Sequence, residues 1–294
     1  MTGIWETADI ITKARMNEKT VIQATGAVIN GLTTYAGMMA FCTSTGSGFI
    51  ADTLYIRNST NASWGIVGVV KLYYVNFGPD DFTSYADQAA ADAVYPSSDT
   101  AKARVNITTD LIDFNSVLDS TNDSISRDLG GSLDDTLWVL RFHMIVTALT
   151  LTAGTEVFIN IGFSSADHTI TRTAAQDSIS FNLSCDNLNR GYRISNGDGA
   201  SMNANNTAGM TETVTNGDNY YIELKKTSGT GVTANIYSNA AFTTLVETQN
   251  ATVATNITGL RYFVIKNGGH ATATGSITVT IDDVGLQNGV STWV

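Results

Sequence analysis

The chain of 294 residues is poor in charged side chains, in basic residues above all. Only 15% of its residues are charged, and 16 Lys and Arg against 27 Asp and Glu give a formal net charge of −11. A surface with so few cations cannot neutralise phosphates, which argues against nucleic acid as a partner. Only six of the acidic residues are Glu, a helix former, and this scarcity argues against a helical protein.

Cysteines and membrane-directed segments are equally scarce. Cys42 and Cys185 are the two cysteines, with no zinc-binding spacing. We expect two buried reduced thiols, and a disulfide between them is the alternative. No window approaches the roughly 20 apolar residues of a membrane span, and no basic segment followed by an apolar run marks a secretion signal. We therefore expect no membrane insertion, and a chain of this kind that works outside cells would leave by lysis or as part of a particle assembled inside.

What the chain does contain is a series of short β-branched and aromatic runs, from about residue 138 to 284. Trp138, Leu140, Phe142 and Met144 alternate with polar or smaller side chains, and Gly, Asn, Asp, Ser and Thr separate the runs. Many short alternating runs with turn residues between them indicate an all-β sandwich or barrel. Further strands are expected at 157–163, 178–184, 219–226, 232–238, 260–267 and 276–284.

The first 75 residues have a different pattern. Residues 8–19 can form a short amphipathic helix, and hairpin-like strands follow at 38–42, 53–57 and 64–74. A unit with so few core residues is marginal alone, so we expect it to pack on a larger domain or on copies of itself. The sequence thus predicts an N-terminal anchoring or assembly module at 1–75 and a second domain at 76–294.

From Asp80 onward the chain resembles the concanavalin A-like lectin/glucanase jelly rolls, the superfamily that includes laminin-G-like modules. Segments 80–82, 134–142, 220–224 and 280–284 carry this resemblance. It implies an antiparallel jelly-roll β-sandwich whose first and last strands pair. The N-terminal part resembles short modules of viral tail-fibre and other virion appendage proteins, at Trp5, 9–17 and 49–64. The expected fold is therefore an all-β jelly-roll sandwich preceded by a small helix-plus-hairpin module.

The carboxylate pattern typical of hydrolysis does not occur in the sequence, which disfavours that activity. Glucanases of the resembled superfamily carry a Glu-x-Asp-x-Glu-like pattern, and retaining glycosidases need two carboxyl groups about 5 Å apart. Here the Glu residues are isolated, and the neighbours Asp282 and Asp283 point to opposite sides of an extended strand. His143, His168 and His270 show no spacing for a Ser/His/Asp or Cys/His site. We expect a protein that is not an enzyme.

Aspartates at the two ends of the domain are the candidate metal ligands. Calcium prefers six to eight hard oxygens, and sandwich families bind a structural Ca²⁺ near such an edge. If the first and last strands pair, residues 80–81 and 282–283 converge. The resemblance thus suggests Asp81, Asp282 and Asp283 as calcium ligands. The alternative is that these aspartates end strands and accept hydrogen bonds from local backbone N–H groups.

Sugar binding by such sandwiches uses exposed aromatic rings flanked by Asp, Asn and backbone groups. Core packing and ordinary turn roles are the alternative for each residue of this type. The candidates by residue type are Tyr192, Asn196, Asp198, Asn203, Tyr220 and Tyr237.

Together these features and the resemblance predict a non-enzymatic structural and adhesion protein of a virion, such as a tail fibre, a spike or a capsid decoration, located at the virion surface or outside cells. Its partners would be copies of itself, as a trimer by analogy, other virion proteins and a cell-surface glycan. A cellular, extracellular carbohydrate-binding lectin-like module is the second hypothesis, and a glycoside hydrolase is the third.

Overall fold

The computed structural model describes residues 22–24, 39–42, 53–57, 63–69, 77–107, 110–118, 122–151, 156–186, 190–202, 204–207, 209–267 and 275–293. The chain divides into two compact units, Met1–Leu72 and Tyr73–Val294. The expected helix at 8–19 lies outside the described residues. Within them, no helix has the length and apolar character needed to cross a bilayer.

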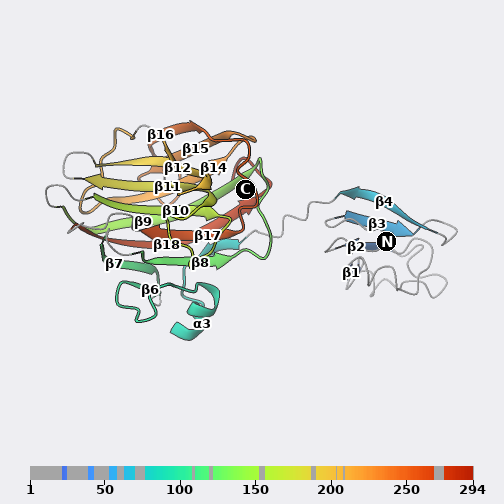
Figure 1. The fold of residues 1–294 in the computed structure, drawn as a ribbon, viewed down its shortest axis with the longest axis horizontal. Helices are drawn as coiled ribbons and strands as arrows, with labels where there is room; N and C mark the ends of the chain where they lie inside the picture. The colour runs from blue at the N-terminus through green and yellow to red at the C-terminus, as the bar shows by residue number, and fades with distance from the viewer. Residues whose placement is uncertain are drawn as a thin grey trace. The chain divides into compact units, whose positions relative to one another are not determined.

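The first unit contains a four-stranded sheet in the order β1-β2-β3-β4 (Figure 1). β1 pairs with β2 in parallel, whereas β2, β3 and β4 are antiparallel neighbours. Consecutive antiparallel strands are what the turn residues between these runs predict. The strands are β1 (Ile22–Ala24), β2 (Met39–Cys42), β3 (Thr53–Arg57) and β4 (Trp64–Val69).

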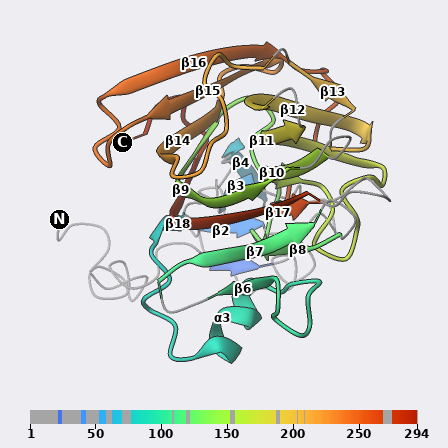
Figure 2. The same ribbon diagram turned by 90° about the vertical axis from the view of Figure 1, so that its left-hand side faces the viewer.

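The second unit is a β-sandwich, which confirms the all-β jelly-roll prediction. Figure 2 shows its two sheets as two layers, and the strands of each sheet follow one another from the top of the view to the bottom. The six-stranded sheet has the order β13-β12-β11-β10-β17-β8. Its strands are β8 (Ser124–Asp128), β10 (Glu156–Ser164), β11 (Gln176–Asp186), β12 (Arg190–Ala200), β13 (Asn205–Asn206) and β17 (Tyr262–Asn267).

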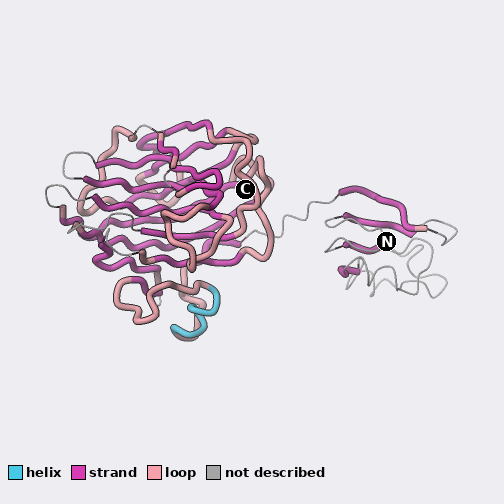
Figure 3. The backbone as a smooth tube through the Cα atoms, viewed as in Figure 1, coloured by secondary structure: helices cyan, strands magenta, loops and turns pink. Residues whose placement is uncertain are grey.

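The eight-stranded sheet has the order β16-β15-β14-β9-β18-β7-β6, and β5 pairs with β18 beside this path. Figure 3 shows how strand dominates the unit; α3 (Gln88–Val94) is the helix that the described part of it contains. The strands are β5 (Phe77–Asp80), β6 (Val105–Ile107), β7 (Ile112–Leu118), β9 (Trp138–Thr150), β14 (Asn219–Lys226), β15 (Gly231–Tyr237), β16 (Leu245–Thr252) and β18 (Ser276–Asn288).

The core lies between the two sheets and is built from alternate residues of each strand. On β9, Trp138 and Phe142 are fully buried and contact aromatic rings of the facing sheet. The Trp138 ring lies 4.9 Å from Phe163, and the Phe142 ring 6.2 Å from Phe181. Burying side chains of this size stabilises the fold by roughly 2 kcal/mol or more each. Cys185 is a buried thiol in the same layer.

The first and last strands of the sandwich pair, as the resemblance implied. Val284 of β18 lies opposite Asp80 of β5. The Asp80 carboxylate then accepts hydrogen bonds from the Tyr85 hydroxyl at 2.6 Å, the Tyr95 hydroxyl at 2.9 Å and Arg127 Nη1 at 3.0 Å. This network fixes the segment that carries α3 against the six-stranded sheet, because Arg127 belongs to β8.

The outer face of the six-stranded sheet is polar and is crossed by residues 165–175, here called the strap. Lys266 of β17 is fully buried under the strap. Its Nζ donates to the carbonyl oxygens of Asp167 at 2.7 Å and Ile170 at 2.9 Å, and to Gln176 Oε1 at 3.0 Å. The Arg172 guanidinium, further along the strap, lies 4.9 Å from the Phe158 ring. One lysine therefore fastens the connection between β10 and β11.

Candidate functional site

The three aspartates predicted to bind calcium lie in one region, at the junction of β5 and β18. Asp81 Oδ1 accepts from the Thr83 backbone N–H at 3.1 Å and from the Thr83 hydroxyl at 2.8 Å. Asp282 Oδ1 lies 2.7 Å from His143 Nδ1. Asp283 has a φ of 49° at a bulge in β18. Asp81 therefore has the local backbone contact that the alternative hypothesis predicted.

The charges of these aspartates interact, but their oxygens do not form a metal site. Burial, followed by the negative charges of Asp282 and Asp81, raises the pKa of Asp283. Nevertheless, no group of three or more His, Cys, Asp or Glu among the described residues could hold a metal ion. Since Ca²⁺ takes six to eight oxygen ligands and the three carboxylates do not gather around one point, this donor set does not fit Ca²⁺.

Two of the predicted sugar ligands are buried residues of β12. Tyr192 has no exposed surface, and its ring stacks on Phe181 with centroids 5.4 Å apart. Its hydroxyl donates to Asp218 Oδ2 at 2.5 Å. Asn196 is 4% exposed, and its Nδ2 donates to the Asn205 carbonyl at 3.2 Å. Because of this burial, neither residue is open to a ligand. Their contacts are the core-packing and strand-pairing roles that the alternative hypothesis predicted.

The remaining candidates do not converge on one site either. The Tyr220 hydroxyl donates to Glu212 Oε1 at 2.6 Å, and Asp198 accepts a hydrogen bond from Asn256 Nδ2. Asn203 lies outside the described residues. Tyr237 differs from the others because it belongs to a cluster of rings on the outer face of the eight-stranded sheet. That cluster is the strongest candidate for a functional site.

We call this cluster the Tyr221 patch. Its residues lie opposite one another on adjacent strands. His143 of β9 is opposite Tyr221 of β14, and Glu223 of β14 is opposite both Arg141 of β9 and Asn235 of β15. Side chains two residues apart on a strand point to the same face, so the neighbouring polar residues gather on one surface. The patch consists of Arg141 and His143 of β9, Tyr221, Glu223 and Lys225 of β14, Asn235 and Tyr237 of β15, Phe242 between β15 and β16, and Trp293 after β18.

Aromatic rings form the apolar part of the Tyr221 patch, and all of them are half-buried. The Tyr221 ring stacks on His143 with centroids 4.3 Å apart, and Phe242 meets it edge-on at 5.8 Å. The Arg141 guanidinium lies 4.2 Å from the Phe242 ring centre and 5.1 Å from that of Trp293. Trp293 has room because Gly285 lies beneath it, where an added Cβ would come within 2.6 Å of the indole.

A buried ion pair forms the polar part of the patch. Glu223, with a side chain only 5% exposed, accepts from Arg141 Nη2 at 2.6 Å and from Lys225 Nζ at 3.1 Å. Asn235 Nδ2 donates to the same carboxylate at 3.2 Å. Burial raises the pKa of Glu223, but Arg141 and Lys225 outweigh it, so that the pKa lies below its usual value. The carboxylate is therefore a fixed anion.

Sequence reasoning did not identify this ion pair. Arg141 and Glu223 are 82 residues apart and meet only because β9 and β14 pair. The alternation of β9 does predict that Arg141 and His143 face away from the core. The identity of their neighbours depends on strand order, for which the local pattern has no signal.

No protein-family model and no curated protein matches the sequence. Among solved structures, the chain is similar to the exoplasmic/lumenal domain of VIP36 in its Ca²⁺/Man3GlcNAc-bound form. The identity is 12%, 65% of this chain and 84% of that chain are covered, and the TM-score is 0.43. The chain is also similar to the lectin UEA-II complexed with galactose. Here the identity is 9%, 72% of this chain and 98% of that chain are covered, and the TM-score is 0.47. A sialidase matches at 10% identity and a TM-score of 0.45 over 86% of this chain, but only 22% of the sialidase is spanned.

Proposed function

We propose that the β-sandwich is a carbohydrate-binding module that is not an enzyme, and that the Tyr221 patch is its binding surface. The observation that supports this most directly is the combination of half-buried rings and fixed hydrogen-bonding groups on one sheet face. A sugar ring has apolar C–H faces that pack on aromatic rings and hydroxyl groups that need polar partners at its edge. Tyr221 and Phe242 supply the first, and Arg141, held in place by the buried Glu223 carboxylate, supplies the second.

The state of Glu223 argues against hydrolysis at this surface. A general acid in a glycosidase needs a raised pKa, so that it holds a proton to give to the leaving group. The pKa of Glu223 is instead lowered by Arg141 and Lys225. The nearby Asp282 carboxylate is engaged by His143. The patch therefore suits holding a sugar and not cleaving its bond.

An uncharged glycan is the ligand that the electrostatics favour. Within the patch the charges of Arg141 and Lys225 are directed at Glu223, and that of His143 is directed at Asp282. Across the chain, the net charge of −11 repels polyanions at long range. We therefore propose neutral oligosaccharides as the ligand class.

A glycan array followed by calorimetry on the full chain tests this proposal. We expect binding to neutral glycans, and Tyr221→Ala or Phe242→Ala to weaken it about ten-fold or more, because each removes a stacking ring. Tyr262→Ala is the matched control, since Tyr262 is a half-buried tyrosine of the other sheet. Failure to bind any neutral glycan, or equal affinities for Tyr221→Ala and the wild type, would contradict the proposal.

We further propose that this module serves a virion adhesin, in which residues 1–72 attach it to the particle or to other copies. The separate sheet of the first unit and the resemblance of its sequence to virion appendage modules support this role. Electron microscopy of purified full-length protein would show a symmetric oligomer, with a trimer as the expected form. A protein that stays monomeric and joins no particle or filament would contradict this part of the proposal.

A further inference from the structure

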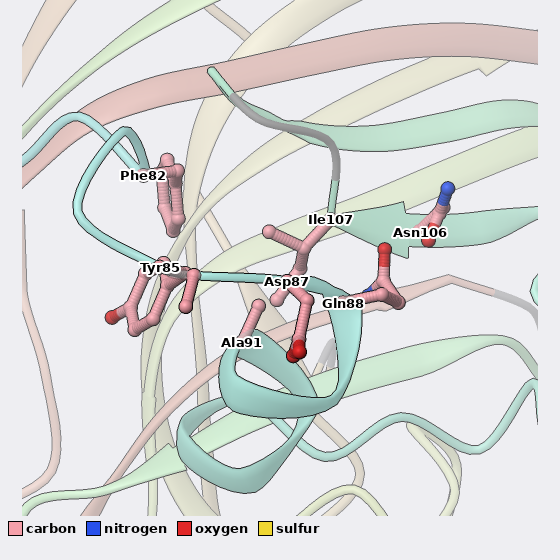
Figure 4. Close-up of a pocket in the computed structure, with 8 residues that line it drawn as sticks. Phe82, Tyr85, Asp87, Gln88, Ala91, Asn106 and Ile107 are labelled. Atoms are coloured by element: carbon pink, nitrogen blue, oxygen red, sulfur yellow. The ribbon is translucent and has the colours of Figure 1, made fainter.

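A pocket lies at the edge of the eight-stranded sheet opposite β16, where α3 meets β6. Its volume is about 330 Å³. Figure 4 shows two aromatic side chains, Phe82 and Tyr85, on one side of it and the amides of Gln88 and Asn106 on the other. In the sheet order, β18 and β7 separate β6 from β9, so this pocket is distinct from the Tyr221 patch.

The floor of the pocket is apolar and rigid. Phe82 is fully buried, and Ala91 and Ile107 are each 2% exposed. The Tyr85 ring cannot swing freely, because its hydroxyl donates to Asp80 Oδ2 at 2.6 Å. Phe82 also packs against Tyr85, with ring centroids 6.3 Å apart. The apolar surface is therefore formed before any ligand arrives, which lowers the entropy cost of binding.

Oxygen acceptors surround this floor. Asn106 Oδ1 is buried and has no hydrogen-bond partner in the part of the chain that the structure describes. Gln88 uses its Nε2 to donate to Asp92 Oδ1 at 2.8 Å, which leaves Oε1 as the open end of its amide. Asp87 uses Oδ1 to accept from the Ala90 N–H at 2.9 Å, which leaves Oδ2. A buried acceptor without a partner is costly, so a donor supplied by a ligand would be favourable there.

An apolar floor with acceptors at the rim selects a ligand that has donor hydrogens at its edge and a C–H face. Among the described residues that line the pocket there is no Lys or Arg. This composition disfavours carboxylates, sulfates and phosphates, which need cationic partners. The volume is at the lower end of the range for ligand sites, which suits one ring and not a chain.

We propose that the pocket formed by Phe82, Tyr85, Asp87, Gln88 and Asn106 binds a single neutral sugar ring, as a second site independent of the Tyr221 patch. This inference rests on the proposed function in taking carbohydrate as the ligand class. It goes further in naming a separate site and the size of its ligand. Asn106 accepts a ligand hydroxyl, and the partly exposed Tyr85 ring contacts the C–H face above the buried floor of Phe82 and Ile107.

The test is a titration of the isotope-labelled full chain with D-glucose, D-galactose, D-mannose and N-acetyl-D-glucosamine, observed by NMR on the side-chain amides of Asn106 and Gln88. We expect at least one sugar to shift these signals saturably. Asn106→Leu should weaken its binding about ten-fold, because one hydrogen bond to a buried acceptor is lost. The thermal midpoint should not fall, since no protein partner of Oδ1 is removed. Asn256→Leu, at an exposed asparagine on another loop, is the matched control.

The outcomes separate this site from the Tyr221 patch. If Tyr221→Ala abolishes oligosaccharide binding while the Asn106 signals still respond to the monosaccharide, both sites exist. If none of the four sugars shifts Asn106 and Gln88, or Asn106→Leu keeps the wild-type affinity, the second site is refuted whatever the patch binds. A response to tetramethylammonium but to no sugar would also refute it, because the acceptors would then serve a cation.

Discussion

His143 on β9 and Asp282 on β18 are joined by a 2.7 Å contact between Nδ1 and Oδ1. The other ring nitrogen of His143, Nε2, lies 2.7 Å from Asn219 Oδ1. With an oxygen acceptor at each nitrogen, the doubly protonated imidazolium satisfies both contacts. Burial lowers the pKa of His143, but the hydrogen bonds to Asp282 and Asn219 outweigh it, so that the pKa is raised. The protonated form of this ring, which stacks on Tyr221, is therefore favoured relative to a free histidine.

The first prediction concerns the pH dependence of this pair. A pKa raised in the folded state gives stabilisation that is fully present below the unfolded pKa of about 6.5 and is lost as pH rises through the folded value. Asp282→Asn should therefore cost about 1 kcal/mol at pH 5.5. The cost should shrink at pH 8.5, where the substitution also relieves repulsion between Asp282 and Asp283. Urea unfolding at the two pH values measures this, and an equal cost at both would refute it.

The second prediction compares two Arg–carboxylate pairs that differ in burial. Glu223→Gln should destabilise the fold by about 3 kcal/mol, because it leaves Arg141 and Lys225 without their anion in a nearly buried position. Asp128→Asn removes the partner of Arg261 at a site where both side chains are almost half exposed. Its cost should stay below about 1 kcal/mol. Similar values for the two variants in urea unfolding would contradict the role given to Glu223.

The sequence predicts the core of the sandwich better than its surfaces. The alternation of β9 identifies the inward positions Trp138 and Phe142 correctly, because a two-residue period is a property of the strand alone. Tyr192 shows the limit. It is two residues from Ile194, and both are buried on the inward face of β12. The surrounding Gly, Arg, Ser and Asn residues hide this alternation, so that a core tyrosine resembles a ligand-binding one.

The predicted calcium site shows a second limit. Pairing of β5 with β18 does bring Asp81 and Asp283 close enough for their charges to interact. However, a bulge lies between Asp282 and Gly285, and Asp283 there has a φ of 49° instead of the extended backbone that the sequence pattern predicts. A bulge depends on how two strands are paired, so one strand's sequence does not reveal it.

The third prediction follows from that geometry. Removing divalent cations with EDTA should leave the thermal unfolding midpoint of the full chain unchanged, since the described residues do not gather a set of ligands for calcium. A ligand that binds only the folded state stabilises it by an amount that grows with the ratio of free ligand to Kd, so a bound structural ion would be visible as a lowered midpoint after chelation. A clear drop that added Ca²⁺ restores would overturn the interpretation of Asp81, Asp282 and Asp283 given above.

The fourth prediction concerns the strap and its buried lysine. Burial lowers the pKa of Lys266 to about 8, from an ordinary value of 10.5. Between these two values the unfolded chain binds more protons than the folded one, so the free energy of unfolding rises with pH by up to about 1.4 kcal/mol per unit. Lys266→Met should remove this rise, because methionine does not titrate.

Urea unfolding of the wild type and of Lys266→Met at pH 8, 9 and 10 measures the difference, since the other titrating groups are common to both proteins. Hydrogen exchange gives an independent readout. The Met202 N–H donates to the Arg172 carbonyl of the strap at 3.1 Å. Without the ammonium group that binds the carbonyls of Asp167 and Ile170, the strap loses its main attachment to β17, and the Met202 amide should exchange faster. Parallel pH curves with unchanged exchange would mean that the strap is held by its other contacts, such as Arg172 on Phe158, and that Lys266 only fills space beneath it.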